Sequence, residues 1–114
     1  IELKFVYRDL PDRLDIVAED ALQILRVLQE SLTNVIKHTR ARQVSVELAL
    51  ERVPPRFVLS VADNGGGFDP GAAVAGRGLS GMRRRAQRIG ASLEVASDSD
   101  GTRITLTYPL IAAA

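Results

Sequence analysis

Hydrophobic residues recur along the chain with two different periods, and the change of period predicts where strands and helices lie. Leu3, Phe5 and Tyr7 alternate with other residues at the start, which predicts a first strand. From about Ile16 to Arg40 the spacing becomes three and four, which predicts one helix with a single apolar stripe. The stripe comprises Ala18, Ala21, Leu25, Leu28, Leu32, Val35 and Ile36.

The rest of the chain predicts four more strands and a second helix. Gln43 to Glu51 alternates cleanly, and Phe57 to Asp63 is a more apolar strand. The second helix is expected from Leu79 to Ile89, because Gly90 is a typical stop signal. The last two strands, Ser92 to Ala96 and Thr102 to Tyr108, are expected to form a hairpin.

This order of elements predicts the fold class. Consecutive strands joined by short turns favour a mixed, mostly antiparallel sheet with both helices packed on one face. We therefore expect an α/β (α+β) two-layer sandwich. Its 114 residues suit one domain, and Ile1 enters a strand at once, so residues 1–114 are interpreted as one domain of a larger protein.

Composition narrows the function classes. The net charge of +1 gives no strong attraction to nucleic acid. The absence of cysteine excludes a disulfide framework, thiolate metal sites and thiol nucleophiles, and it suits a reducing compartment. No apolar run approaches the ~18 residues that span a bilayer, and no signal peptide is expected.

The segment from Asp63 to Met82 holds seven of the nine glycines. Asp63 ends a strand on its apolar face, so its carboxylate is expected to be partly buried and to need a donor. Gly65, Gly66 and Gly67 would let a flat ligand lie against the backbone beside that carboxylate.

A second group of glycines, at 76, 78 and 81, leads into a helix, whose free N–H groups favour an anion. One end of the segment suits a base and the other suits phosphates, so a nucleotide is indicated. "GRGLSG" fits the G-x-G-x-x-G pattern, but it follows a loop rather than opening a βαβ unit, and a Walker-type motif is absent.

The first helix carries candidate ligands for a metal and phosphates. Glu30, Asn34, Lys37 and His38 form a polar stripe roughly opposite Leu28, Leu32 and Val35. A carboxylate, an amide oxygen and a cation in one line suit Mg²⁺ bound together with phosphate groups. An ordinary solvated helix face is the alternative interpretation.

Four segments in order resemble the GHKL (Bergerat-fold) ATP-binding domain. "LQESLTNVIKHT" resembles its N box, "DNGGG" its G1 box and "GRGLSGM" its G2 box, while "DGTRITLTYPL" resembles its last, G3-like segment. The order and spacing agree over nearly the whole chain. Within this family the sequence is most similar to the catalytic domains of sensor histidine kinases, in the nitrate-sensor and DesK-like subfamily.

The resemblance implies ATP bound between the helix layer and a mobile lid. Asp63 would accept a hydrogen bond from the adenine amine, and Thr102 would hold a water near the base. Asn34 would bind Mg²⁺ with Glu30 nearby, and these two are the implied catalytic residues. The implied nucleotide-binding set is Asn34, Lys37, His38, Asp63, Gly65, Gly67, Gly76, Gly78, Leu79, Gly81, Met82 and Thr102. The amides from Gly78 to Gly81 would cradle the phosphates.

Several assignments remain open at this point. The lid is short, because only Asp69 to Ala75 separates Phe68 from Gly76, and no separate F-box phenylalanine is visible. Glu30 could align a water as a general base, or it could only order Mg²⁺ and solvent. His38 suits either a phosphate contact or a structural hydrogen bond, and its place in the N box makes it a poor phosphoacceptor.

A basic cluster on the second helix also has two interpretations. Arg83, Arg84, Arg85 and Arg88 form either a solvated face or a docking surface for an acidic or helical partner.

The resemblance implies one function and leaves alternatives. The domain would bind Mg·ATP and donate the γ-phosphoryl group to a histidine on the dimerisation helices of a parent homodimer, which then serves a response regulator. The domain would be cytoplasmic, in a parent that could be anchored in the membrane, with no nucleic acid as partner. The alternatives are an anti-sigma-factor-type serine kinase of the same fold and a non-catalytic nucleotide-gated interaction module. Gyrase-like and chaperone ATPases fit less well.

Overall fold

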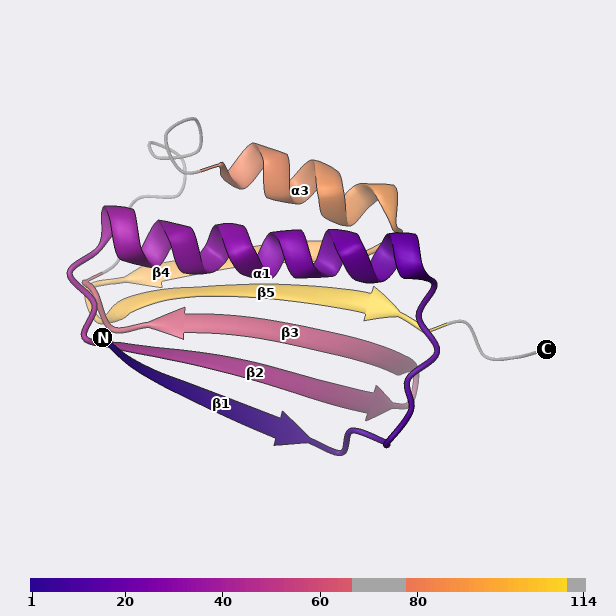
Figure 1. Ribbon diagram of the computed structural model, residues 1–114. Coiled ribbons are helices and arrows are strands. Elements are labelled where there is room, and N and C mark those ends of the chain that lie inside the picture. Colours follow the sequence, from indigo (N-terminus) through magenta and orange to yellow (C-terminus); the bar gives the residue numbers. More distant parts are fainter. Residues whose placement is uncertain (67–77, 111–114) are drawn as a thin grey trace.

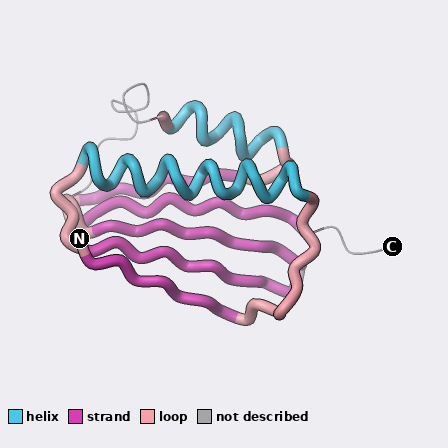
Figure 2. The backbone as a smooth tube through the Cα atoms, in the orientation of Figure 1, coloured by secondary structure: helices cyan, strands magenta, loops and turns pink. Residues whose placement is uncertain are grey.

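The computed structural model describes residues 1–66 and 78–110, which form one sheet with two helices on one of its faces (Figure 1). The tube in Figure 2 shows the two helices as a layer above the strands. The elements are β1 (Glu2–Arg8), α1 (Ala18–His38), β2 (Gln43–Arg52), β3 (Pro55–Asp63), α3 (Leu79–Arg88), β4 (Ser92–Asp98) and β5 (Gly101–Pro109). The predicted order of strands and helices is confirmed, although most strands are longer than predicted.

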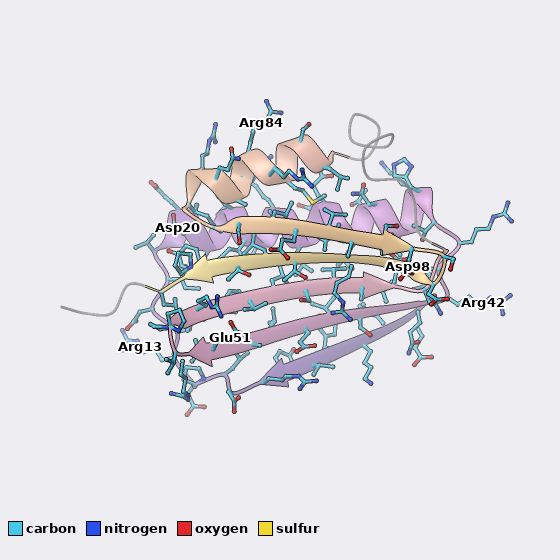
Figure 3. All side chains as sticks on the ribbon, turned by 180° about the vertical axis from the view of Figure 1, so that it is seen from behind. Arg13, Asp20, Arg42, Glu51, Arg84 and Asp98 are labelled. Atoms are coloured by element: carbon cyan, nitrogen blue, oxygen red, sulfur yellow. The ribbon has the colours of Figure 1, made fainter. Side chains whose placement is uncertain are left out.

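The sheet is mixed and mostly antiparallel, as predicted. Its five strands lie in the order β1-β2-β3-β5-β4, and only the β1–β2 pair is parallel. In this register Asp63 of β3 stands between Val44 of β2 and Thr102 of β5. Figure 3 shows the labelled residues Arg42 and Asp98 near this end of the sheet, with Arg13 and Asp20 near the other end.

The hydrophobic core lies between the helices and the central strands. Leu59 and Leu106 contribute from the sheet, and Leu79 and Met82 contribute from α3, with all four side chains fully buried. Burying side chains of this size stabilises a fold by roughly 1.5–3 kcal/mol each, so this layer fixes α3 against the sheet. Gly90 ends α3 in a left-handed conformation with φ of 73°, as the sequence predicted.

The apolar stripe predicted for α1 is only partly the face that it buries. Leu25 and Ile36 of that stripe are 59% and 69% exposed, whereas Ile24 and Val27 are buried. The helix carries apolar residues around more than half of its circumference, so the sequence alone does not show which part meets the core. Packing against α3 and β3 selects the face centred on Ile24, Val27 and Ser31.

Strand β1 is present as predicted, but its apolar side is not covered. Leu3, Phe5 and Tyr7 are all exposed. Leu3 and Phe5 pair with Val44 and Val46, which are buried beneath the helices, so the two strands present these residues on the same face. The described helices pack over β3 and β4 rather than over β1.

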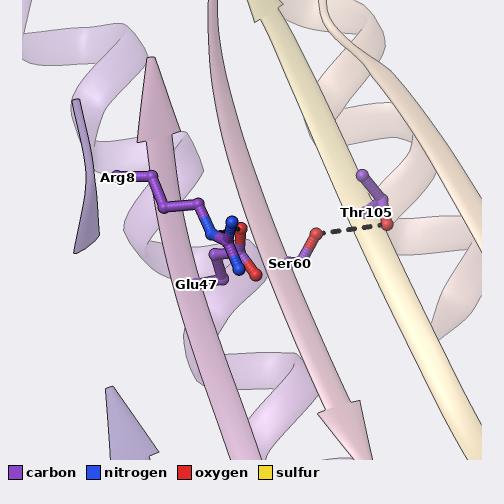
Figure 4. A network of polar contacts seen from close by, with 4 residues as sticks. All are labelled: Arg8, Glu47, Ser60 and Thr105. Atoms are coloured by element: carbon purple, nitrogen blue, oxygen red, sulfur yellow. Dashed lines mark hydrogen bonds and ion pairs between the residues drawn. The ribbon is translucent and has the colours of Figure 1, made fainter. Parts of the chain in front are cut away.

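The other face of the sheet is polar. The Nε atom of Arg8 lies 2.8 Å from Oε1 of Glu47, and the hydroxyls of Ser60 and Thr105 lie 3.4 Å apart (Figure 4). Exposed ion pairs of this kind add little stability, about 0–1 kcal/mol. Within the described residues, neither helix is long and apolar enough to cross a bilayer.

Candidate functional site

The carboxylate of Asp63 is positioned by the end of β3. The residue is half-buried and shares a strand face with Val61, as the alternation of β3 predicted. The backbone N–H of Gly65 donates to Oδ1 of Asp63 at 2.8 Å. This bond orients the carboxylate, which retains the capacity to accept from a further donor.

A small cavity connects this carboxylate to α1. It has a volume of about 10 Å³ and is lined by Ser31, Asn34, Val35, Thr39, Val61, Asp63, Thr102 and Ile104. This is roughly the space that one water molecule needs, and its walls offer the several polar groups that a buried water requires. The cavity therefore joins Asp63, Thr102 and Asn34, three residues that the sequence placed in one nucleotide site.

Thr102 reaches the cavity from the strand beside Asp63. It is buried together with Ile104 and Leu106, with which it shares a strand face. Its hydroxyl lies 3.1 Å from the hydroxyl of Ser97 on β4, which is its partner in the strand register. A hydroxyl can donate and accept at once, so Thr102 can hold Ser97 and a water together.

Asn34 is a buried polar residue with an unused donor. It is only 7% exposed, and among the described residues its Nδ2 atom has no hydrogen-bond partner. A buried amide without a partner costs about 1–3 kcal/mol, so this donor requires a water or a ligand group in the adjoining cavity. Rotation of the amide by 180° exchanges its nitrogen and oxygen. Asn34 can therefore either donate to a phosphate oxygen through its nitrogen or bind a cation through its oxygen.

The predicted polar stripe on α1 needs a correction. Asn34 does not lie opposite the core face, because it is buried beside Ser31 and Val35. Glu30, Lys37 and His38 are exposed, as a polar face requires. The four residues follow one edge of the core face, where Asn34 turns inward and the charged residues border solvent.

Glu30 extends toward the start of α3. Its Oε2 atom lies 3.3 Å from the point that a Cβ atom on Gly78 would occupy. Gly78 is the N-cap of α3, has a left-handed φ of 70° and provides no side-chain cap. The first N–H groups of an uncapped helix are available to an anion, and no acidic residue occupies this first turn.

The other residues predicted in the second glycine group divide into two kinds. Leu79 and Met82 are core residues, and the hydroxyl of Ser31 contacts the sulfur of Met82 at 3.6 Å. Any contact of these two with a ligand must therefore come through their backbone. Gly81 borders open space, since no atom lies within 4 Å of a Cβ placed there. Gly67, Gly76 and the lid from Asp69 to Ala75 lie outside the described residues.

Thr39 is a supporting residue that the sequence interpretation missed. Its hydroxyl donates to the carbonyl of Val35 at 2.8 Å and accepts from the N–H of Ala41 at 3.2 Å. A Cβ atom on Gly65 would lie only 2.6 Å from that of Thr39. Glycine at position 65 is therefore required by close packing against the end of α1, and a threonine directly after a helix is the signal that marks it.

Asn64 is a second supporting residue that the sequence interpretation missed. Its Oδ1 atom accepts from the N–H groups of Arg42 at 2.9 Å and Gln43 at 3.0 Å. Its own N–H donates to the carbonyl of Gln43 at 3.3 Å. Asparagine commonly bonds to backbone groups outside regular structure, and here it ties the residue after Asp63 to the segment after α1.

The donor set fits Mg²⁺ held jointly with phosphates. In the part of the chain that the structure describes, no three His, Cys, Asp or Glu side chains form a metal cage. Mg²⁺ is usually bound by one or two protein oxygens, with substrate phosphates and water as its other ligands. Asn34 and Glu30 can supply such ligands from one helix.

Comparison with known proteins agrees with this geometry. Residues 19–112 match the family described as histidine kinase-, DNA gyrase B-, and HSP90-like ATPase. The chain is 33% identical over 112 residues to the signal transduction histidine-protein kinase/phosphatase UhpB of Salmonella typhimurium, covering 96% of this chain and 22% of that protein. It is 38% identical over 89 residues to the sensor histidine kinase LiaS of Bacillus subtilis, covering 76% of this chain and 24% of LiaS.

Solved structures show the same fold. The histidine kinase domain of the blue-light activated kinase from Erythrobacter litoralis EL346 superposes with a TM-score of 0.72 at 24% identity, covering 95% of this chain and 55% of that one. The Acinetobacter baumannii histidine kinase AdeS superposes with a TM-score of 0.76 at 14% identity, and the match covers 97% of this chain and 55% of that one. The chain spans about a quarter of the curated relatives that it matches. It belongs to the histidine kinase-, DNA gyrase B-, and HSP90-like ATPase family, and within it to the ATP-binding catalytic domains of sensor histidine kinases.

Proposed function

We propose that this domain binds Mg·ATP beside the cavity at the end of β3 and presents the γ-phosphoryl group to a histidine of another domain. One observation carries the proposal: Asp63, Thr102 and the unpartnered Asn34 amide meet at a single buried cavity. The cavity itself has room for about one water, so the nucleotide would lie against these polar groups rather than inside the cavity.

Each residue has a distinct role in this proposal. Asp63 accepts a hydrogen bond from the adenine amine, and Thr102 holds a water that also contacts the base. Asn34 and Glu30 supply oxygen atoms for Mg²⁺, which when bound neutralises charge on the phosphate oxygens. Gly65 lets the segment after Asp63 pack against Thr39, which would hold the Asp63 carboxylate in place for the base.

The phosphate end of the site lies between the C-terminal part of α1 and the start of α3. The free amides from Leu79 to Gly81 would bind phosphate oxygens, with Lys37 and His38 placed on the opposite side. Phosphoryl transfer depends mainly on positioning and on electrostatic stabilisation. The chain would supply both from the C-terminal part of α1 and the start of α3.

The phosphoacceptor is proposed to lie in the dimerisation helices of the complete kinase, with a response regulator as the next acceptor. A cytoplasmic location belongs to this proposal, because ATP is supplied there. The serine kinase and the non-catalytic module are not favoured, since the matched relatives UhpB and LiaS are named as histidine kinases.

Calorimetric titration of the 114-residue chain with a non-hydrolysable ATP analogue and Mg²⁺ tests the site. Asp63→Asn should weaken binding by about 1–3 kcal/mol, because the asparagine side chain can turn its own N–H donor toward the adenine amine, which is also a donor. Asp12→Asn, at an exposed loop position, is the matched control and should bind normally. Equal affinity in a folded Asp63→Asn variant would remove Asp63 from the site.

A further inference from the structure

One side of α1 exposes large apolar residues. Leu25 and Ile36 are 59% and 69% exposed. At about 100° per residue, Leu25 lies about 200° around the helix from Gln23, and Ile36 lies about 20° from Leu25. Gln23 accepts a hydrogen bond from Arg85 of α3 at 3.0 Å, so the exposed apolar side of α1 faces away from α3.

The uncovered part of the sheet is apolar on the same face. Leu3, Phe5 and Tyr7 of β1 are 49%, 48% and 64% exposed. Their register with β2 places them on the face that carries the helices. Figures 1 and 2 show β1 at the edge of the sheet farthest from α3. We call the combined surface of Leu3, Phe5, Tyr7, Leu25 and Ile36 the α1–β1 face.

The length of the α1–β1 face matches one helix. Val44 and Val46 of β2 are already buried, so the uncovered part of the sheet is β1 itself, at the edge of the sheet. The seven residues of β1 extend about 23 Å at about 3.3 Å per residue. A helix of about 15 residues, rising about 1.5 Å per residue, has the same length.

We propose that the α1–β1 face binds an amphipathic α-helix of about 15 residues, supplied by polypeptide outside these 114 residues. Such a helix would lie beside α1 and complete the helix layer over β1. Large apolar side chains that are exposed together on one surface are typical of a site that binds another polypeptide segment. The matched relatives have ample polypeptide for it, because the shared stretch is only 22% of the length of UhpB and 24% of LiaS.

The absence of cysteine from the chain allows a direct test. Single cysteines are introduced as Phe5→Cys and Ile36→Cys, with Val53→Cys as the matched control, because Val53 is exposed by 93% in the turn between β2 and β3. All three positions are exposed, so the variants should fold, which circular dichroism checks. The rate of thiol labelling is measured in the 114-residue chain and in the full-length protein, with any other cysteine changed to serine.

The thiols of the Phe5→Cys and Ile36→Cys variants should be labelled about tenfold more slowly in the full-length protein than in the 114-residue chain. The thiol of the Val53→Cys control should react equally in both. Equal rates in all three variants would overturn the proposal. Protection that already develops in the 114-residue chain as its concentration rises would assign the face to a second copy and would equally overturn it.

A photo-crosslinker attached to the thiol of the Phe5→Cys variant identifies the occupant in the full-length protein. The crosslinked peptide should carry apolar residues at spacings of three and four. Crosslinking to a segment without this periodicity would contradict a helix. The labelling and crosslinking are performed without nucleotide, so the result is independent of the function proposed above.

Discussion

Gly101 of β5 lies so close to Asp63 that a Cβ atom at position 101 would overlap the Asp63 carbonyl oxygen. No side chain fits at this contact, and the φ of 156° at Gly101 also disfavours one. Gly101→Ala should therefore move the end of β3 and destabilise the domain by about 2–4 kcal/mol. Urea unfolding measures the change in the free energy of unfolding.

The control for this prediction is Gly90→Ala. Gly90 also has a positive φ, of 73°, but no atom lies within 4 Å of its Cβ position. Gly90→Ala should lower the free energy of unfolding only by the backbone strain of about 1–2 kcal/mol, and nucleotide affinity should stay unchanged. If both variants lose the same stability and the same affinity, the close contact with Asp63 has no special role.

Removal of the Asn64 side chain should loosen the connection between Asp63 and α1. Asn64→Ala removes the acceptor of two backbone N–H groups, those of Arg42 and Gln43. Since these bonds are exposed, we expect a loss of about 1 kcal/mol in stability, with weaker binding of the ATP analogue. Asn64→Asp retains the acceptor oxygen and should restore both, whereas failure of this variant to rescue would show that the amide itself is required.

Asn34→Ala should weaken binding of the ATP analogue more with Mg²⁺ than with EDTA. The reason is that Asn34 is a buried residue whose amide has an unused donor and can turn its oxygen to a cation. Titrations are compared in the two conditions, with Thr33→Ala on the same helix as the control. An equal loss in both conditions would indicate that Asn34 serves packing or phosphate binding instead.

Tyr108 should make stability sensitive to high pH. Its hydroxyl donates to the carboxylate of Asp20, and this bond, with burial and the nearby negative charge, raises the pKa of Tyr108 from 10.0 to about 12. A group whose pKa is higher in the folded than in the unfolded state stabilises the protein at pH values below the unfolded pKa. This stabilisation is lost as the pH rises through the folded pKa. The stabilisation should therefore be complete below pH 10 and vanish near pH 12.

Tyr108→Phe is the variant that tests this dependence. The wild type should exceed it in the free energy of unfolding by about 1 kcal/mol below pH 10, and the difference should shrink toward pH 12. Urea unfolding at several pH values gives both curves. A difference that stays constant across this range would mean that the hydroxyl contributes no titrating interaction.

The isolated chain should bind ATP without phosphorylating itself on histidine. Its only histidine, His38, is exposed in the last turn of α1, beside the proposed phosphate end of the site. In-line transfer needs a nucleophile beyond the γ-phosphoryl group at about 3–3.5 Å, and a residue of the site wall does not reach this position. Incubation with γ-labelled ATP should give no acid-labile label. Label that disappears in His38→Gln would overturn this assignment.

The sequence predicted most of the fold because its local patterns agree with the final packing. The alternation in β2 and β3, the stop at Gly90 and the hairpin before β5 are short-range signals, and each is confirmed. The buried face of α1 was predicted only in part. Which of its apolar sides meets the core depends on where α3 packs, and that is a long-range contact that no local pattern contains.

The residues of the candidate site that are recognisable by type and strand position could be predicted from the sequence. Those that act through contacts between distant segments were missed. Asp63 and Thr102 could be placed by strand alternation, and the structure brings both to one cavity. Thr39 and Asn64 act through backbone groups of segments distant from the glycines, so their importance follows only from the folded geometry. The chemical roles of all these residues remain predictions for the experiments above.

Helix α3 starts at Gly78, which has a left-handed backbone and no side-chain cap. The order of its first turn should therefore depend on whether a nucleotide is bound. Without an anion, the amides from Leu79 to Gly81 depend on solvent, and this turn should fray and exchange its hydrogens rapidly. A bound phosphate would act as the missing cap. Because Met82 in the next turn packs on Ser31 of α1, order gained at Gly78 would stiffen the joint between the two helices, and the domain would carry information about its nucleotide in the rigidity of that joint.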